Sequence, residues 1–179
     1  MQILLDIIRI IGEVYITIVL LRFILQVARA DFYNPISQFI TKATNPLLFP
    51  LRRVIPGWKG LDFASLILAL VLQFLLECVT RTVPLDHIIP LSGQLLAISL
   101  IALISSAIQL YTFALFIIVI ISWIAPGSYH PGAMLLHQIT EPLLKPIRSV
   151  LPATGGLDFS PMVLLLILFV LGRVVTGAY

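Results

Sequence analysis

Charged residues are scarce in this chain. Asp, Glu, Lys and Arg together make up 11% of its 179 residues, whereas soluble domains average about 25%. Such a shortage argues against a soluble globular domain, because few polar side chains remain to face water. The few charges that are present therefore carry more information than they would in a soluble protein.

Cysteines and catalytic motifs are also nearly missing. Cys78 is the single cysteine, which excludes an intramolecular disulfide and a CxxC metal or redox site. His130 and His137 are seven residues apart, but no cysteine or further carboxylate completes a ligand set. No Walker loop, GxSxG, HExxH or dinucleotide fingerprint occurs. The sequence predicts no metal, no cofactor and no enzymatic activity.

Apolar sequence, in contrast, is abundant. Hydrophobic residues make up 60% of the chain, and the mean hydropathy is +1.11. A helix needs about 20 mostly apolar residues to cross about 30 Å of hydrocarbon. Four windows supply this length, at residues 3–27, 61–83, 95–124 and 157–177. We therefore expect an all-α membrane protein with four transmembrane helices.

The chain repeats itself at an offset of 96 residues without a gap. Each copy consists of a helix, an interfacial proline-rich loop and a second helix, with the loops at 28–60 and 125–156. The first copy spans residues 1–83, the linker 84–94 and the second copy 95–179. Two helices per copy make the copies parallel, related by a pseudo-two-fold axis along the membrane normal. The repeated residues include Thr44, Pro46, Leu47, Leu48, Pro50, Arg52, Val54, Pro56, Gly60, Leu61, Asp62 and Phe63, which recur from Thr140 to Phe159.

Basic residues concentrate in the two loops. Of the 11 Lys and Arg, five lie between the first two windows and two between the last two. The positive-inside rule places both loops on the cytoplasmic side and both termini on the other side. The net charge of +3 favours contact with anionic lipid headgroups and not with nucleic acid.

Each loop contains two short elements. In the segment 35–44, apolar residues recur at helical spacing on one face and polar residues occupy the other faces. This pattern predicts a short interfacial helix. The following element carries a proline every four to six residues, and each proline lacks an N–H donor. We predict that Pro50 and Pro146 break this element into short turns. The proline motif comprises Pro46, Pro50, Pro56, Pro142, Pro146 and Pro152.

Basic residues of the loops are candidates for binding a lipid phosphate or a partner carboxylate. A guanidinium at headgroup depth can make paired hydrogen bonds to such groups. In the alternative interpretation, the loops are rigid interfacial connectors whose arginines merely reach the headgroups. The candidates are Arg52, Arg53, Lys145 and Arg148.

Two aspartates, Asp62 and Asp158, follow a repeated Gly-Leu pair and open an apolar run. This is where a carboxylate can cap the first free N–H groups of a helix. A second interpretation is a charge-assisted contact with Arg52 and Arg148, which would lock each loop to the helix that follows. Both can hold together, because a carboxylate has several acceptor sites.

Ionisable side chains inside the windows predict a polar seam. In an antiparallel hairpin of the first two windows, residues of equal depth have numbers that add up to about 86. The matched pairs are Asp6 with Arg81, Arg9 with Glu77, and Glu13 with Gln73. In the second copy, Gln109 replaces Glu13 and Arg173 lacks an acidic partner, so that Glu13 or Glu77 becomes its candidate. An ion or proton path along Glu13 and Glu77 is the alternative.

The duplicated motif T-x-P-L-L-x-P-[LI]-R-x-V-[IL]-P-x-x-x-G-L-D-F and the segment D-F-Y-N-P-I-S-Q-F at residues 31–39 resemble the YggT/YlmG family of small bacterial and plastid membrane proteins. The resemblance covers essentially the whole chain, although the second copy reads P-G-S-Y-H-P at residues 126–131. It implies a multi-pass protein of the bacterial inner membrane, in a family without an established catalytic residue. With the orientation from the positive-inside rule, the loops are then cytoplasmic and the termini periplasmic. Members of this family are linked to osmotic-stress tolerance, ion homeostasis, genes beside the cell-division cluster and, in plastids, cytochrome cofactor assembly.

Two functional hypotheses remain open at this point. In the first, the protein is a non-enzymatic scaffold or assembly factor that acts through its proline-rich loops, where the repeated residues concentrate. The second is an oligomeric ion transporter or channel, motivated by Glu13, Glu77 and Arg173 at membrane depth. The expected partners are a bilayer with anionic headgroups, a membrane protein and further copies of this chain.

Overall fold

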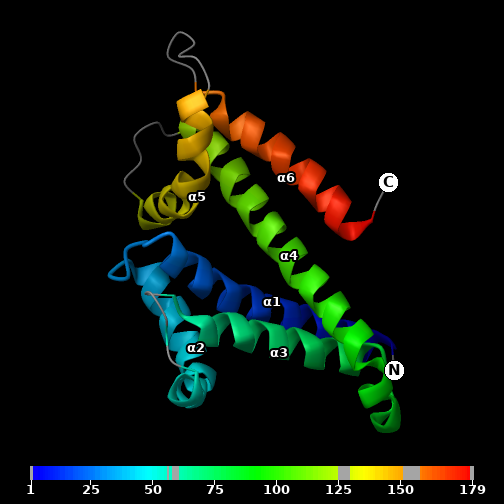
Figure 1. The fold of residues 1–179 in the computed structure, drawn as a ribbon. Coiled ribbons are helices and arrows are strands. Elements are labelled where there is room, and N and C mark those ends of the chain that lie inside the picture. The colour runs from blue at the N-terminus through cyan, green and yellow to red at the C-terminus, as the bar shows by residue number, and fades with distance from the viewer. Residues whose placement is uncertain (1, 56, 58–60, 125–129, 151–157, 178–179) are drawn as a thin grey trace. The chain divides into compact units, whose positions relative to one another are not determined.

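The computed structural model describes residues 2–55, 57, 61–124, 130–150 and 158–177. Over these residues the chain is all-α, as expected, with six helices and no β-strand. The helices are α1 (Gln2–Val27), α2 (Pro35–Val54), α3 (Phe63–Thr80), α4 (Leu85–Ile124), α5 (Pro131–Val150) and α6 (Ser160–Thr176), as drawn in Figure 1.

Two helices of the described residues, and not the expected four, are long and apolar enough to cross a membrane. They are Phe63–Thr80 of α3 and Asp86–Ser122 of α4. The apolar helix α6 has 17 residues. The 26-residue helix α1 is interrupted by charges at Asp6, Arg9, Glu13 and Arg22.

The residues expected as a linker, 84–94, are helical from Leu85 onward, so α4 is 40 residues long. Asp86 in the first turn complements the positive end of the helix dipole. Pro90 lies inside the helix and removes only one backbone hydrogen bond. The apolar sequence on its C-terminal side continues the helix through the window at 95–124.

The chain forms two compact units, which do not coincide with the two sequence copies. Unit 1 comprises Met1–Phe23 and Ile40–Ala107, and unit 2 comprises Ile24–Phe39 and Ile108–Tyr179. The start of α2 therefore belongs to the same unit as α5 and α6. Each unit has its own apolar core.

The core of unit 1 joins α1, α2, α3 and the first part of α4. α1 and α3 approach closely at Gly12, where an added Cβ would lie 2.7 Å from Cδ1 of Leu76. A larger residue at this position would force Leu76 to move, so Gly12 permits the close packing. The buried residues are Ile16, Val19, Leu48, Ala64, Leu68, Ala69, Leu76 and Leu103.

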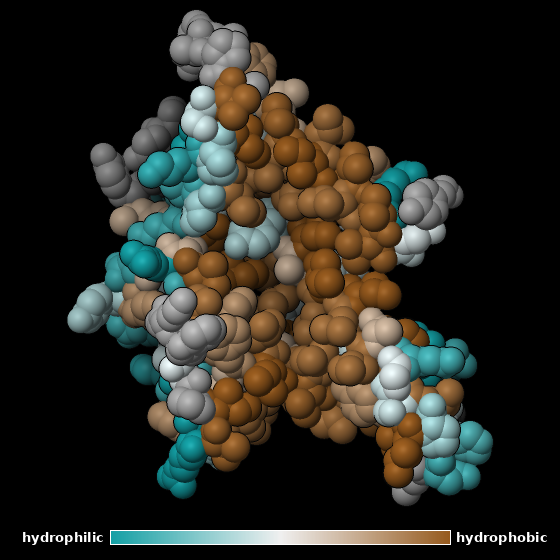
Figure 2. All heavy atoms as spheres, in the orientation of Figure 1, coloured by the Kyte–Doolittle hydropathy of each residue, from teal (hydrophilic) through white to brown (hydrophobic). Residues whose placement is uncertain are grey.

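A core cluster of unit 2 joins α4, α5 and α6. Its buried residues are Leu115, Leu144, Leu164 and Leu168. On the outside of α6, large apolar side chains such as Phe169 and Leu166 are exposed. Figure 2 shows a largely apolar surface on the face in view. Extensive exposed apolar surface is uncommon in soluble monomers and fits a hydrocarbon environment.

α2 and α5 continue through their internal prolines, so the predicted break into short turns is wrong. Pro46 and Pro50 lie inside α2, and Pro142 and Pro146 lie inside α5. The two prolines of each helix are four residues apart, so the missing hydrogen bonds fall on one side and the helix bends there. Both ribbons are visibly bent in Figure 1. α5 begins and ends 96 residues after α2. The motif prolines at 56 and 152 lie outside the described residues.

Candidate functional site at the bent helices

Arg52, near the end of α2, pairs with Asp62, the residue before α3. Both Nη2 and Nε of Arg52 donate to the Asp62 carboxylate, the latter at 3.4 Å. Asp62 is buried, whereas 39% of the Arg52 side chain remains exposed. A guanidinium that meets a carboxylate with two donors fixes orientation as well as distance. The pair therefore ties the bent helix to the helix that follows it.

Asp62 makes no side-chain capping bond to α3, although it occupies the N-cap position. Its carboxylate is engaged by Arg52 instead. The backbone carbonyl of Asp62 accepts the N–H of Ser65 at 3.0 Å and the Ser65 hydroxyl at 2.7 Å. The capping interpretation does not hold at this aspartate, because Arg52 is the stronger, charged donor.

Arg148 occupies the equivalent position in α5 and contacts two carboxylates. Its Nε donates to Asp158 at 2.9 Å, and its Nη1 donates to both oxygens of Glu141 at 2.8 Å. Asp158 also accepts the N–H of Ser160, the first residue of α6, at 2.9 Å, together with the Ser160 hydroxyl. Here the carboxylate both binds the arginine and contacts the start of the next helix.

The hydrogen bonds of Asp158 lower the pKa of its carboxyl group. Partial burial alone would raise the pKa of this carboxyl group, but the bonds from Ser160 and Arg148 outweigh burial and lower it. The same contacts act on the arginine. Burial alone would lower the pKa of Arg148, and the bonds to Glu141 and Asp158 raise it above its usual value.

Arg22 of α1 is a site residue that the sequence analysis missed. It is 6% exposed and packs against α2. Its Nη1 donates to the Thr41 carbonyl at 3.1 Å, to Oγ1 of Thr44 at 2.5 Å and to Oδ1 of Asn45 at 2.8 Å. The available signal was a cation inside an apolar window, outside the stripe formed by residues 6, 9 and 13. At the equivalent position of the second copy stands Ile118.

Tyr15 also holds α2 in place. Its hydroxyl donates to the Ala43 carbonyl at 3.3 Å. The Thr41 and Ala43 carbonyls lie just before Pro46, where the regular hydrogen-bond pattern of α2 is interrupted. Pro46 leaves the Lys42 carbonyl without its regular donor, and the side chains of α1 add bonds to the two carbonyls on either side of it.

The remaining basic candidates, Arg53 and Lys145, are exposed. Among the described residues neither forms an ion pair. Both are thus available to an external anion at the surface of their helix.

The predicted polar seam between α1 and α3 is wrong in its pairing. Arg9 donates to Oγ1 of Thr80 at 3.3 Å. Glu77 is bonded by Arg81 at 2.7 Å and by Gln73 at 3.4 Å, both from its own helix. Residues four apart share a helix face, so Arg81 reaches Glu77 without matching the depth of two helices.

The other seam candidates are exposed. Asp6 and Glu13 lie on the outside of α1, and their carboxylates bind neither Arg81 nor Gln73 within the described residues. The guanidinium of Arg173 lies 5.1 Å from the ring centre of Phe169, one turn earlier in α6, in a cation–π contact. Gln109 lines a shallow apolar hollow with Phe113.

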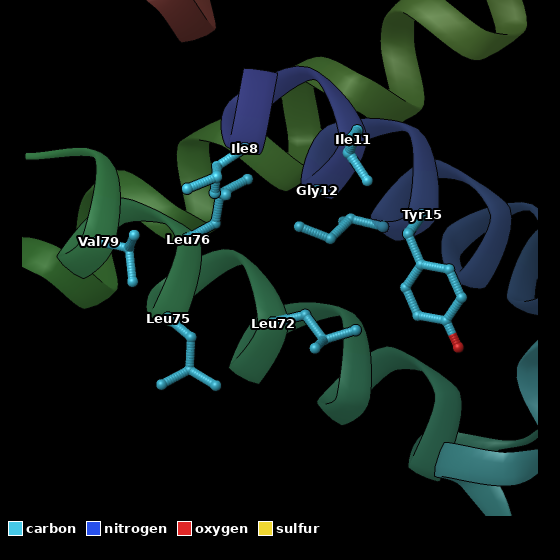
Figure 3. A pocket seen from close by; sticks show the side chains of 9 residues that line it. Ile8, Ile11, Gly12, Tyr15, Leu72, Leu75, Leu76 and Val79 are labelled. Atoms are coloured by element: carbon cyan, nitrogen blue, oxygen red, sulfur yellow. The ribbon is translucent and has the colours of Figure 1, made fainter. Parts of the chain in front are cut away.

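An apolar groove of about 380 Å³ lies between α1 and α3 (Figure 3). Its lining includes Ile8, Ile11, Leu72 and Val79, and no charged side chain. The one polar group, the hydroxyl of Tyr15, is engaged with α2. The groove therefore offers apolar contacts and this single phenol.

Comparisons with known proteins place the chain among bacterial relatives. A family profile described as CCB3/YggT matches residues 1–83 and 97–179. The chain is 54% identical over 151 residues to an uncharacterized protein of Pseudomonas aeruginosa, covering 84% of this chain and 77% of that protein.

Two further relatives are of similar length. Uncharacterized protein YggT of Escherichia coli (strain K12) is 43% identical over 160 residues, covering 89% of this chain and 81% of that protein. An uncharacterized Vibrio alginolyticus protein, described by its place in the proC 3′ region, is 44% identical over 152 residues, covering 85% and 82%. No solved structure matches the chain significantly.

Proposed function

Because this chain belongs to the CCB3/YggT family, we propose that it is a non-enzymatic, multi-pass membrane protein that serves as a scaffold or assembly factor. The observation that carries the proposal is the arginine–aspartate pair that fastens each bent helix, Arg52 with Asp62 and Arg148 with Asp158. A helix fastened at its end presents its outer surface in a fixed orientation, which lowers the entropy cost of binding a partner.

The outer surface of α2 has the composition of a binding surface. Phe39 and Phe49 are 65% and 59% exposed, and Leu47 and the basic Arg53 lie on the same helix. Apolar side chains beside basic ones suit the boundary between lipid headgroups and acyl chains. An aromatic side chain exposed there can also anchor a membrane protein partner.

The proposed arrangement has α1, α3, α4 and α6 in the inner membrane, with α2 and α5 at its cytoplasmic surface. Two of these four helices have the length and composition of a span. Arg22, the charge of α1 that lies nearest to α2 in sequence, is satisfied by α2 and not by lipid, which reduces its cost in hydrocarbon. The basic residues of both loops favour the cytoplasmic side.

Guanidinium chemistry provides the test. Lysine keeps the charge but cannot make the paired contact, so Arg52→Lys together with Arg148→Lys should abolish function while membrane insertion persists. We expect the double variant to fail in complementing growth of a deletion strain under hyperosmotic shock. Arg29→Lys, an exposed arginine without an ion pair among the described residues, is the matched control and should complement.

An oligomeric ion transporter is the second candidate, favoured by Glu77, which is 9% exposed within an apolar helix. Its pairing with Arg81 neutralises the charge, which is unfavourable for an ion path. The two functions give opposite results. A scaffold tolerates Glu13→Gln and Glu77→Gln and gives no ion flux in liposomes that contain only this protein. The opposite result would be ion flux that is lost in Glu77→Gln, together with a double lysine variant that still complements. That result would reject the scaffold function in favour of ion transport.

A further inference from the structure

The polar cluster around Arg22 in unit 1 contains more positive than negative charge. Arg22 interacts electrostatically with both Arg52 and Asp62. Two guanidiniums and one carboxylate leave one positive charge uncompensated. Asp62 forms its ion pair with Arg52. The hydrogen-bond acceptors of Arg22 are therefore neutral groups, on Thr41, Thr44 and Asn45.

Burial makes this imbalance important. Arg22 is 6% exposed, and a buried ion without a counterion is strongly disfavoured. Its three hydrogen bonds all start from Nη1. Among the described residues Arg22 forms no ion pair. The guanidinium therefore keeps a positive charge that no contacting carboxylate compensates.

We propose that this cluster is a binding site for a phosphate group, held by Arg22, Arg52 and the side-chain amide of Asn45. The planar fork of a guanidinium matches the oxygens of a phosphate, and two arginines supply more donors than Asp62 can accept. Arg52 is 39% exposed in its side chain and leaves a route of entry. The exposed apolar residues of α2 make a phospholipid headgroup one source of the phosphate, and free phosphate is the other.

The second copy provides an internal comparison. At the positions of Arg22 and Asn45 it has Ile118 and Glu141. Arg148 is there matched by two carboxylates, on Glu141 and Asp158. A phosphate would be repelled by this pair, so we expect one site per chain. The site does not depend on the proposed scaffold function, because phosphate binding requires no protein partner.

The test uses the full chain purified in detergent and reconstituted in nanodiscs. Inorganic phosphate is titrated against chloride at equal ionic strength, and phosphatidylglycerol is compared with phosphatidylcholine, with ligand retention followed by native mass spectrometry. Arg22→Gln should weaken phosphate or phosphatidylglycerol binding about tenfold or more. The control Arg29→Gln removes the same charge from an exposed position and should bind normally.

A second variant keeps the test decisive if Arg22→Gln fails to fold. Asn45→Glu copies the residue of the second copy and supplies an internal counterion, so it should fold and lose phosphate binding. Binding of phosphatidylglycerol alone would identify a headgroup site, and binding of inorganic phosphate would identify a free-phosphate site. Absence of both, or equal weakening by Arg22→Gln and Arg29→Gln, would overturn the proposal.

Discussion

Arginines at equivalent positions of the two copies have different surroundings. Asp62, the partner of Arg52, keeps 7% of its side chain exposed, whereas Asp158, the partner of Arg148, keeps 47%. Buried ion pairs are costly to break, because the remaining charge has no water to replace its partner. Exposed pairs are screened by solvent and contribute little. The two contacts therefore differ in stability although their sequence motif is the same.

Truncation of each arginine should show this difference. Arg52→Ala leaves the buried Asp62 carboxylate without its donor, and we expect the free energy of unfolding to fall by about 2 kcal/mol. Arg148→Ala should cost less than about 1 kcal/mol. Denaturation of the purified chain in mixed micelles measures both. Equal losses would mean that burial does not set the strength of these pairs.

Acid should weaken the contact in unit 2. Asp158 has a lowered pKa in the folded chain, so its stabilising effect is full above the usual aspartate pKa and is lost as pH falls through the folded value. Because the group is half-exposed, the effect is small. We expect the difference in melting temperature between wild type and Asp158→Asn to shrink from about pH 7 to about pH 3. A difference that grows on acidification would show that the pKa is raised instead.

Regular secondary structure in α2 and α5 was only partly predictable. The amphipathic start at residue 35 and the repeat offset followed from the sequence, since polar and apolar residues alternate at helical spacing. Helix continuity through Pro46 and Pro50 did not follow, because local rules treat each proline as a break. The missing information was tertiary: Arg22 and Tyr15 of α1 donate additional hydrogen bonds to carbonyls beside the bend.

The bend itself can be tested. Replacing both Pro46 and Pro50 by Ala restores two backbone hydrogen bonds and should straighten α2, which moves the Thr41 carbonyl away from Arg22. We expect the chain to become less stable, by about 1 to 3 kcal/mol, although alanine favours helix. The same change at Pro142 and Pro146 is the control.

α5 has no buried arginine at its bend, since Ile118 stands in that place. The control variant should therefore lose less stability or gain some. Thermal denaturation of both variants gives the comparison. Equal destabilisation of the α2 and α5 variants would show that the prolines affect stability through their own helix and not through its contact with Arg22.

The helical class and the two-fold sequence repetition were predictable at the scale of the whole molecule, because hydropathy and an uninterrupted offset determine them. Side-chain pairing was not. Matching residues of equal depth in two helices placed Arg9 opposite Glu77. In the structure Glu77 forms its ion pair with Arg81, which lies four residues later on the same face of α3. Arg22 was missed for a similar reason, as its acceptors on α2 are backbone and amide oxygens that carry no charge signal.

Membrane topology is the prediction at this scale. Both loops should face the cytoplasm and both termini the periplasm. In a variant with Cys78 replaced by alanine, single cysteines beside Lys42 and Lys145 should be protected from an impermeant thiol reagent in intact spheroplasts. Cysteines near either terminus should react. Labelling of either loop from outside would show that the loops face the periplasm and that the predicted orientation is wrong.

The segment at residues 24–39 has a consequence for the equivalence of the two copies. It belongs to the first copy by sequence, yet it is part of unit 2, where the N–H of Asp31 donates to Gln138 at 2.9 Å and the Asn34 amide donates to the Pro131 carbonyl at 2.8 Å. The equivalent helix of the second copy, α5, lies in unit 2 as well, so only the first copy contributes this part of its sequence to the other unit, and the two copies are not structurally interchangeable.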